Sequence, residues 1–473
     1  MVRDSMPPAR PFPLDATAGP SDAPVRRSIP AAKVARILAP SRAIAMALAL
    51  LVAAAATAQE AGSGEPGALP EPAGNRTAEV QEAMEEARWT FGNTKLSPYL
   101  GLVDSGWVRN AFDAVDADEV DDFTATLRAG LSLFHRIGTE SVLALWGLPE
   151  YVWWADLEDR RRLNGRYGAG WYADFTRLGI EIEATRADEQ RRITPEVREL
   201  TSQRADRALA GARIGLYRSL DLQLRASSSD FDALVDPGPL GARAQFGRLD
   251  RREEVFQIGL AMRLRDAVDV AVGAFQVSTE FEQSAASPDS VRLDNDGDGL
   301  YLELAQERTR VEWRTRLEHR ELDPEGPAAT ARFPGFDDLL GLSAITLHSL
   351  DRRRSLGFYG RRELFYALGP EFAYFISERF GATSHLDLGR STTVQLTAEV
   401  GDLSFQPIVG TTLQRGDDLT SFGVTVLQEL PYGVGLSLGV LHGTIDSSSA
   451  SLADDRSITS LTFGLDLRSI SWP

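Results

Sequence analysis

The chain has 473 residues, a formal net charge of −18 at pH 7 and no cysteine. The lack of cysteine excludes disulfides, thiolate metal sites and cysteine nucleophiles. The acidic balance argues against a nucleic-acid partner, which would need a basic face. Length alone suggests about three domains, but a large β-barrel of this length is a single domain.

The N-terminal residues have the pattern of an export signal. An apolar run over residues 43–58 ends in Ala56, Thr57 and Ala58. Five basic residues precede this run: Arg26, Arg27, Lys33, Arg36 and Arg42. A basic flank, an apolar stretch and a small-residue cleavage site are typical of a secretory signal peptide, and the run is shorter than the ~20 residues of a membrane-spanning helix. Residues 1–58 are therefore predicted to be an over-extended N-terminus and a signal peptide that is cleaved after Ala58.

The next segment, residues 59–95, predicts a periplasmic linker with one short helix. Residues 59–75 are rich in Gly, Pro, Ala and Glu, which favours a flexible linker. Residues 77–88 combine helix-forming residues with Thr77 at the N-cap position. A plug, a tether and a solvated helix are all open interpretations, and the acidity of the segment favours a solvated helix.

From Leu96 onward, apolar and polar residues alternate with a period of two, so that each strand has one apolar and one polar face. Clear apolar series begin at Phe123, Ile180, Leu220, Phe256, Val311, Val394, Val434 and Leu461. About eighteen such segments, with sixteen as the alternative, reach the C-terminus, and each is about ten to fourteen residues long, as tilted membrane strands require. The predicted fold of residues 96–473 is all-β: a closed antiparallel up-and-down transmembrane β-barrel.

The lengths of the connections support a barrel over a soluble β-sandwich. Short turns, such as His135–Thr139 and Glu429–Tyr432, alternate with long loops, such as Arg109–Val120 and Asp230–Glu253. Bacterial barrels have short periplasmic turns and long outer loops, which predicts an even number of strands. Aromatic residues near the strand ends are interpreted as a membrane-interface girdle: Trp107, Tyr151, Trp153, Trp154, Trp171, Tyr172, Phe358 and Tyr359.

The polar positions of the strands carry charges of both signs. They are predicted to line a water-filled interior, where they form ion pairs that rigidify the wall, tune the selectivity of a path for a hydrophilic solute, or do both. The candidates are Glu181, Glu183, Asp221, Gln223, Arg225, Arg263, Arg265, Glu312, Arg314, Arg316, Glu318 and Glu399.

Few motifs in the chain carry other chemistry. Asp294, Asp296 and Asp298 lie in an Asp-Asn-Asp-Gly-Asp-Gly stretch that is similar to the start of a calcium loop, but the twelfth position is Ala305 and not the bidentate Glu that calcium prefers. A polar loop that opens a strand is the favoured interpretation, with a calcium site as the alternative. The five histidines have no metal-ligand spacing, and no nucleophile motif is present, so no other cofactor and no enzymatic activity are expected.

Two segments resemble a known family. Leu96-Ser97-Pro98-Tyr99 through Trp107, and then Asp122-Phe123-Thr124-Ala125-Thr126-Leu127, are similar to the opening strands of the outer-membrane barrels of the "beta-barrel porin 2" type, which accompany exopolysaccharide export systems. The resemblance implies an outer-membrane barrel in polysaccharide export. Such barrels end in an aromatic residue, whereas this chain ends in Ser471-Trp472-Pro473, which departs from the usual signal for the assembly machinery.

The sequence therefore predicts a pore or export channel of the bacterial outer membrane for a hydrophilic substrate, with exopolysaccharide as the specific hypothesis. A non-transporting structural or adhesive barrel is the alternative, and an outer-membrane hydrolase is the third. The expected partners are membrane lipid and lipopolysaccharide, the barrel-assembly machinery and components of polysaccharide export.

Overall fold

The structure is a computed structural model that describes residues 76–467, except 112–118, 192–193, 197–200, 235–246, 265–267, 283–292, 352, 390, 432–433 and 449–455. The predicted signal peptide, the linker up to residue 75, Arg265 and the C-terminal residues 471–473 lie outside this part of the chain. The described residues all belong to one compact unit, Ala47–Pro473.

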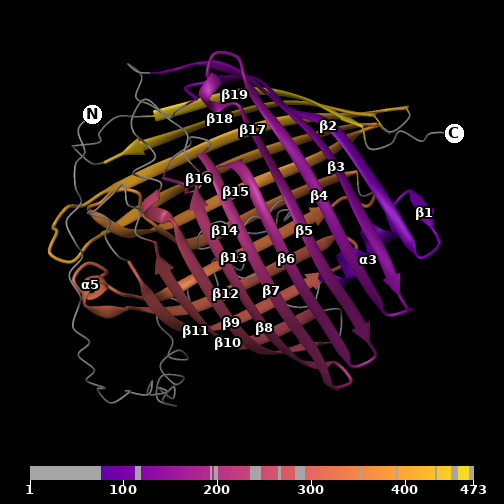
Figure 1. Ribbon diagram of the computed structural model, residues 1–473. Coiled ribbons are helices and arrows are strands. Elements are labelled where there is room, and N and C mark those ends of the chain that lie inside the picture. Colours follow the sequence, from indigo (N-terminus) through magenta and orange to yellow (C-terminus); the bar gives the residue numbers. More distant parts are fainter. Residues whose placement is uncertain are drawn as a thin grey trace, which may run out of the picture. The chain divides into compact units, whose positions relative to one another are not determined.

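Eighteen antiparallel strands form a closed barrel (Figure 1), which confirms the predicted fold and excludes the alternative of sixteen strands. Each strand pairs with the next in sequence, and β19 pairs with β2 to close the sheet, from Thr459–Arg109 to Leu467–Leu100. The strands are β2 (Thr94–Arg109), β3 (Asp122–Ile137), β4 (Ser141–Trp154), β5 (Arg162–Phe175), β6 (Leu178–Arg191), β7 (Thr201–Tyr217), β8 (Leu220–Ala233), β9 (Arg251–Arg263), β10 (Val268–Phe281), β11 (Asn295–Glu307), β12 (Val311–Pro324), β13 (Phe336–His348), β14 (Arg354–Tyr366), β15 (Phe372–Leu388), β16 (Thr392–Pro407), β17 (Gly416–Leu430), β18 (Val434–Ser447) and β19 (Arg456–Leu467).

Short elements complete the described structure. The helix α3 (Arg76–Glu86) is followed by the strand β1 (Trp89–Phe91), which forms a hairpin with β2. The 3₁₀ turns η2 (Glu158–Arg160) and η3 (Gly247–Leu249) and the helix α5 (Gly326–Thr330) lie in connections between strands. No helix in the described part of the chain is long and apolar enough to span a membrane.

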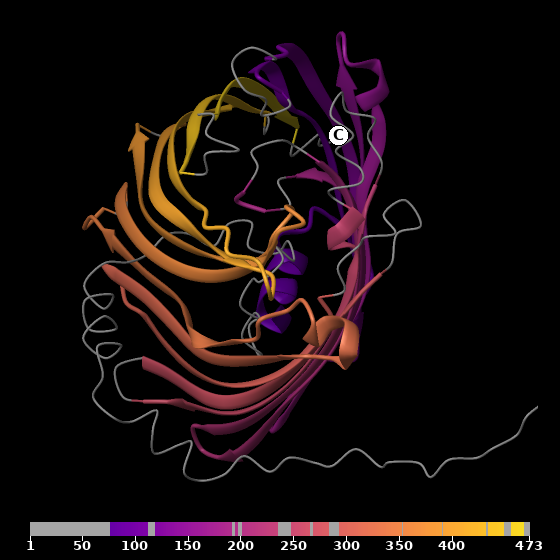
Figure 2. The same ribbon diagram turned by 90° about the vertical axis from the view of Figure 1, so that its left-hand side faces the viewer.

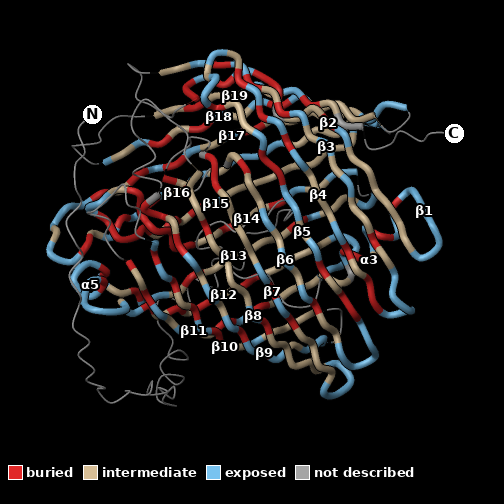
Figure 3. Tube along the Cα trace, in the orientation of Figure 1, coloured by how far each residue is buried: buried red, intermediate tan, exposed pale blue. Residues whose placement is uncertain are grey.

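The connections alternate in length as predicted, which gives the barrel a short-turn end and a long-loop end. The short turns include residues 138–140, 176–177 and 218–219, and the long loops include residues 110–121, 234–250 and 282–294. The loop from β14 to β15, residues 367–371, is short although it lies at the long-loop end. Figure 3 shows that buried positions are concentrated toward the end that contains α5, which is the long-loop end.

The wall is interrupted between β13 and β14 at the long-loop end. These two strands pair only from Gly341–Arg362 to His348–Ser355, so residues 363–366 of β14 pair with β15 alone. Residues 336–340 of β13 likewise pair only with β12. The last residues of β14, the connection and the first residues of β15, residues 363–376, are called the β14–β15 tip below.

Candidate functional site: the interior of the barrel

The outer face of the barrel is apolar. Alternate positions of neighbouring strands expose large apolar side chains, and the set includes Leu127, Leu131, Ile182, Phe256, Ile258, Leu260, Met262, Val272, Leu302, Phe380, Leu396, Val400, Phe422, Leu438, Val440, Leu461 and Phe463. A soluble barrel would turn this face inward, whereas a membrane barrel turns it toward lipid. Trp107, Tyr151 and Trp153 are exposed as a membrane-interface girdle requires.

Three members of the predicted aromatic girdle point inward. Trp154 and Tyr172 are each 1% exposed, and Tyr359 donates a hydrogen bond to the inward Glu399. Trp153 and Trp154 are consecutive in β4, so only one of them can face outward. For these three residues, the interpretation as a girdle is wrong.

Eleven of the twelve predicted lining residues lie on the inner face, and Arg265 lies outside the described residues. Most of them are engaged in ion pairs with one another or with neighbouring strands. Examples are Arg225 with Glu181 at 3.9 Å and Arg263 with Asp269 at 2.7 Å. The placement agrees with the alternation in the sequence; that these residues line a conducting path stays a prediction.

One ion-pair lattice covers the inner face of β11 and β12. Glu303 lies 2.9 Å from Arg314 and 3.6 Å from Arg316, and Glu318 lies 3.7 Å from Arg316 and 2.5 Å from Arg320. Arg316 also stacks over the ring of Tyr301, 4.6 Å from its centroid, as a cation–π contact. Glu318 is fully buried, so this lattice forms part of the wall itself.

A second lattice covers the inner face of β14, β15 and β16. Glu399 accepts hydrogen bonds from Tyr359 at 2.6 Å and from Arg361 at 3.0 Å, and Arg379 lies 2.7 Å from Glu363. A Cβ atom at Gly381 would lie 2.2 Å from the Tyr359 ring, so glycine is required where the ring crosses the next strand. Of these residues only Glu399 was predicted to line the interior, although Tyr359, Arg361 and Glu363 occupy alternate positions of one strand.

The β14–β15 tip turns into the barrel and packs on both of its faces. On one face, the hydroxyl of Tyr366 accepts a hydrogen bond from the side-chain amide of Asn295 at 2.9 Å and donates to Thr279 at 3.4 Å, on the inner face of β11 and β10. The same face joins an apolar cluster that includes Phe275, Phe281, Leu293, Leu322, Phe333, Phe336, Leu340, Leu364, Tyr374 and Ile408. The opposite face packs Phe365, Ala367, Phe372 and Phe375 against Leu403, Phe405, Leu419 and Ile445.

The loops close the wall outside the tip. The backbone N–H of Val409, between β16 and β17, donates to the carbonyl of Arg332, between β12 and β13, at 3.0 Å. Arg362 spans the interruption below this point, because its guanidinium donates to the carbonyl of Leu339 at 2.7 Å and pairs with Asp338 and Glu378 at 2.6 and 2.8 Å. The tip is therefore held inside a wall that is sealed by side chains and loops where strand pairing stops.

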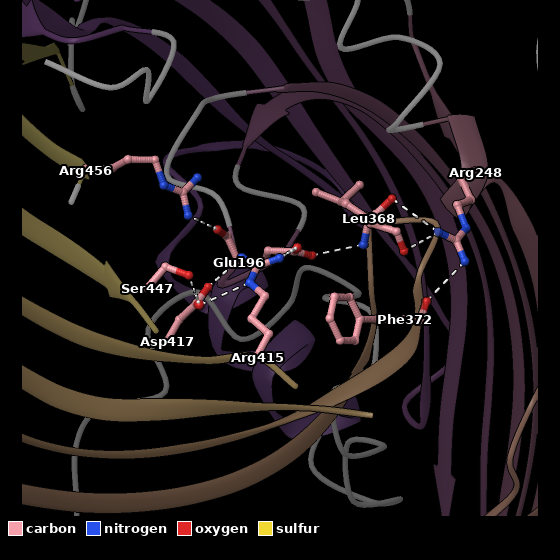
Figure 4. Close-up of polar contacts among 9 residues, drawn as sticks. Glu196, Arg248, Leu368, Phe372, Arg415, Asp417, Ser447 and Arg456 are labelled. Carbon is pink, nitrogen blue, oxygen red and sulfur yellow. Dashed lines mark hydrogen bonds and ion pairs between the residues drawn. The ribbon is translucent and has the colours of Figure 1, made fainter. Parts of the chain in front are cut away.

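Polar contacts hold the β14–β15 tip from the sides (Figure 4). Glu196, in the connection from β6 to β7, accepts from the N–H of Leu368 at 2.9 Å and pairs with Arg415 at 2.6 Å. Arg415 also pairs with Asp417 at 2.5 Å. Arg248, in η3, donates to the carbonyls of Leu368, Gly369 and Phe372, and burial lowers its pKa to about 10. Because these partners come from loops far apart in the sequence, the alternation pattern could not predict them.

The inner face of β17, β18 and β19 is different, because short neutral residues occupy its middle. The inward positions there are Ser421, Gly423, Thr425, Ser437, Gly439, Leu441, Gly443, Ser460, Thr462 and Gly464. A Cβ atom at Gly439 would lie 2.8 Å from the hydroxyl of Thr462, so the residues of this strip lie close together. We call this set the hydroxyl strip; its short side chains reach less far into the interior than the arginines of the two lattices.

The helix α3 lies inside the ring of strands (Figure 2). Val80, Met84 and Ala87 form a buried apolar cluster with Phe134, Val142, Ala144 and Tyr172 on the inner face of β3, β4 and β5. Burying a Val or Met side chain is worth roughly 1.5–3 kcal/mol, which is needed because an isolated helix of this length is marginal in water. The interpretation as a solvated helix is wrong, because the apolar residues repeat on one helical face and that face is covered.

An ion pair fixes the N-terminal end of α3. The guanidinium of Arg76 donates to Glu183 at 3.2 Å, and the hydroxyl of Tyr172 donates to the same carboxylate. The ammonium group of Lys95 donates to the carbonyl of Glu85 at 3.3 Å near the other end. Glu183, which the sequence predicted to line the interior, is therefore covered by the helix.

The calcium candidates are spread along an extended segment. Asp296 and Asp298 are exposed on the outer face of β11, and Asp294 precedes the strand and accepts a hydrogen bond from the N–H of Phe281 at 2.8 Å. The described residues contain no group of three His, Asp or Glu side chains arranged to hold a metal. A calcium site at these residues stays a hypothesis.

One place in the interior brings a serine, a histidine and a carboxylate to the same level. Ser355 and His385 are cross-strand neighbours in β14 and β15, and His385 lies 3.1 Å from Asp387. The structure gives Ser355 no hydrogen bond to His385, and the hydroxyl that Asp387 accepts from belongs to Thr393. A nucleophile needs contact with its base, so this group does not form a catalytic triad.

Comparisons with known proteins return only distant structural similarity. No protein-family model matches the chain, and no curated protein matches it. The barrel is similar to a BenF-like porin from Pseudomonas fluorescens Pf-5, at 10% identity over 80% of this chain and 99% of that one, with a TM-score of 0.47. It is also similar to OccK3 (OpdO) from Pseudomonas aeruginosa, at 12% identity over 82% and 97% with a TM-score of 0.46, and to OccK9 (OpdG) from the same organism, at 12% over 79% and 98% with a TM-score of 0.46.

Proposed function

We propose that this protein is a channel of the bacterial outer membrane for the passive passage of small hydrophilic solutes. The observation that carries the proposal is that the middle of the barrel wall has an apolar outer face and a largely polar inner face, with exposed residues such as Leu260 outside and paired charges such as Arg263 and Asp269 inside. Lipid stabilises the outer face and water the inner face. Export through a signal peptide that is cleaved after Ala58, and contact with lipopolysaccharide and the assembly machinery, belong to this proposal.

The hydroxyl strip is the part of the wall best suited to a solute path. Its members are uncharged, and all of them except Leu441 are short, as Ser437 and Thr462 are. Hydroxyl groups both donate and accept hydrogen bonds, so they can replace the hydration of a polyol or sugar without selecting one charge. Small neutral or zwitterionic solutes fit this surface.

Exopolysaccharide export is the more specific hypothesis and remains open to test. A polymer needs a wide continuous path, whereas the β14–β15 tip and α3 both occupy interior space. These two elements favour small solutes over a polymer. They also support the second candidate function, a non-transporting barrel whose long loops are the working surface, because a filled interior does not need to conduct. We expect no enzymatic activity from either.

Conductance across planar bilayers separates the two candidates. The refolded barrel is added to bilayers of neutral phosphatidylcholine, and its folding is checked independently by the heat-dependent shift in gel mobility. Discrete conductance steps are expected from a channel. A folded and inserted barrel that produces no steps would support the non-transporting barrel.

A further inference from the structure

We propose that α3 is a selectivity element inside the channel: it narrows the short-turn end and controls which solutes pass. The inference rests on the proposed channel function. Its basis is that α3 is not a linker helix outside the barrel but a docked element whose partners, Phe134, Val142 and Tyr172, are inward residues of three different strands. All three lie within the few residues of β3, β4 and β5 that are nearest the short-turn end of the barrel.

The contacts of α3 leave one face directed away from the wall. Val80 and Met84 lie on one side of the helix, because residues four apart share a face, and Ala87 directly after the helix joins the same cluster. Four glutamates occupy the other side and are exposed: Glu79, Glu82, Glu85 and Glu86. The helix therefore adds both bulk and negative charge to the interior.

The nearby wall offsets this charge only in part: Lys95 and Arg136 lie on the same inner face as Phe134 and Val142, and the ammonium group of Lys95 donates to the carbonyl of Glu85 at 3.3 Å. Arg213 pairs with Asp174 at 2.6 Å, and Arg225 lies 3.9 Å from Glu181, so these wall arginines already have carboxylate partners. Arg76 is shared between Glu79 at 3.3 Å and Glu183 at 3.2 Å. Among the described residues, the carboxylates of Glu82, Glu85 and Glu86 make no ion pair. A charged group in a confined aqueous path repels ions of its own sign, so docked α3 disfavours anions.

The attachment of α3 rests on a small apolar contact together with the contacts of Arg76 and Lys95. Met84 is 1% exposed and lies at the centre of the contact. The chain on the C-terminal side of α3 continues through β1 into β2, so a released helix stays tethered to the barrel. Release of α3 would therefore widen the path without loss of the barrel.

Single-channel recording of three variants and one control variant tests the proposal. Met84→Asp places a charge in the apolar contact and is expected to release α3, which raises the conductance. Replacing all four glutamates by glutamine keeps the apolar contact and is expected to shift the reversal potential in a KCl gradient toward anions, with little change in conductance. Arg76→Gln is expected to increase open-state noise or conductance, whereas Arg88→Gln, which removes the same charge from an exposed residue outside the helix, is the matched control and should change neither.

The outcomes separate this inference from the channel function. If the unaltered barrel conducts and Met84→Asp and the glutamine variant leave both conductance and reversal potential unchanged, the role of α3 is refuted and the channel stands. If the unaltered barrel is silent and Met84→Asp conducts, passive passage through the unaltered barrel and the selectivity role of α3 are both refuted, because the docked helix then blocks the interior completely. If folded and inserted barrels of every variant are silent, the channel function fails and the role of α3 fails with it.

Discussion

Individual charged residues inside this barrel are held by partners on neighbouring strands, and the most buried of them contribute to the stability of the wall. Glu318 is fully buried between Arg316 and Arg320. Removing one partner of a buried ion pair leaves an uncompensated charge and costs about 3–5 kcal/mol. The ion pairs of the two interior lattices are therefore expected to stabilise the fold, whether or not their residues also contact a solute.

Glu318→Gln is accordingly expected to destabilise the barrel by about 3–5 kcal/mol, measured by thermal or denaturant unfolding in detergent micelles. The control is Glu307→Gln, which neutralises an exposed glutamate at the other end of the same wall region. Equal stability of the two variants would show that the Arg316–Glu318–Arg320 contacts are not structural.

Asp250 gives a prediction for pH dependence. Burial raises the pKa of this carboxyl to about 7, although it accepts a hydrogen bond from the N–H of Ala233 at 2.6 Å. Between the ordinary pKa of about 3.9 and this value, the folded protein binds a proton that the unfolded chain has lost, so the free energy of unfolding falls as the pH rises. Raising the pH through this window is expected to lower the free energy of unfolding of the native protein more than that of the Asp250→Asn variant. The asparagine keeps an acceptor oxygen but cannot ionise. Parallel pH profiles of the two melting temperatures would contradict this assignment.

At the scale of elements, the inward β14–β15 tip is the largest feature that the sequence did not predict. The strands themselves follow from the alternation, because their outer residues meet one environment and their inner residues another. The tip breaks that rule, since Phe365 and Phe375 on one face and Leu364 and Tyr374 on the other are all buried. Apolar residues on both faces of the segment from Leu364 to Phe375 were the available signal, and they indicate a hairpin that leaves the wall.

Phe375→Ala tests the role of the tip. Phe375 is fully buried and stacks on Phe365 with ring centroids 5.5 Å apart. Truncating such a side chain is expected to cost about 3–5 kcal/mol and to loosen the tip, which would appear as larger or noisier conductance steps. Phe380→Ala, on the exposed outer face of the same strand, is the control. Indistinguishable behaviour of the two variants would show that the tip does not restrict the interior.

The placement of α3 shows a similar limit of sequence analysis. Its helix was predicted from composition and a capping residue, and the structure has it over Arg76–Glu86. Its location was missed because the apolar face has only Val80, Met84 and Ala87, and four glutamates dominate the composition. The partner of a short apolar face is set by tertiary contacts, which a single sequence does not reveal.

For the whole molecule, the number of strands, their antiparallel order and the alternation of short and long connections were all predicted from the sequence. These properties repeat at every strand, so an error in the predicted bounds of one strand does not change the predicted fold. Pairing of β19 with β2 closes the barrel. Closure is expected for a barrel in lipid, because an open edge would leave backbone groups unpaired there. The contents of the interior depend instead on single contacts such as Glu196 with Arg415, and only the structure reveals them.

The central claim is that hydrophilic solutes cross this barrel, and solute entry into proteoliposomes tests it most directly. Purified barrel is inserted into liposomes, and swelling rates are measured for neutral sugars of increasing size. Swelling that is fast for the smallest sugars and falls steeply with size is predicted, because the β14–β15 tip and α3 restrict the interior. Folded, inserted barrels that admit none of the sugars would contradict the account.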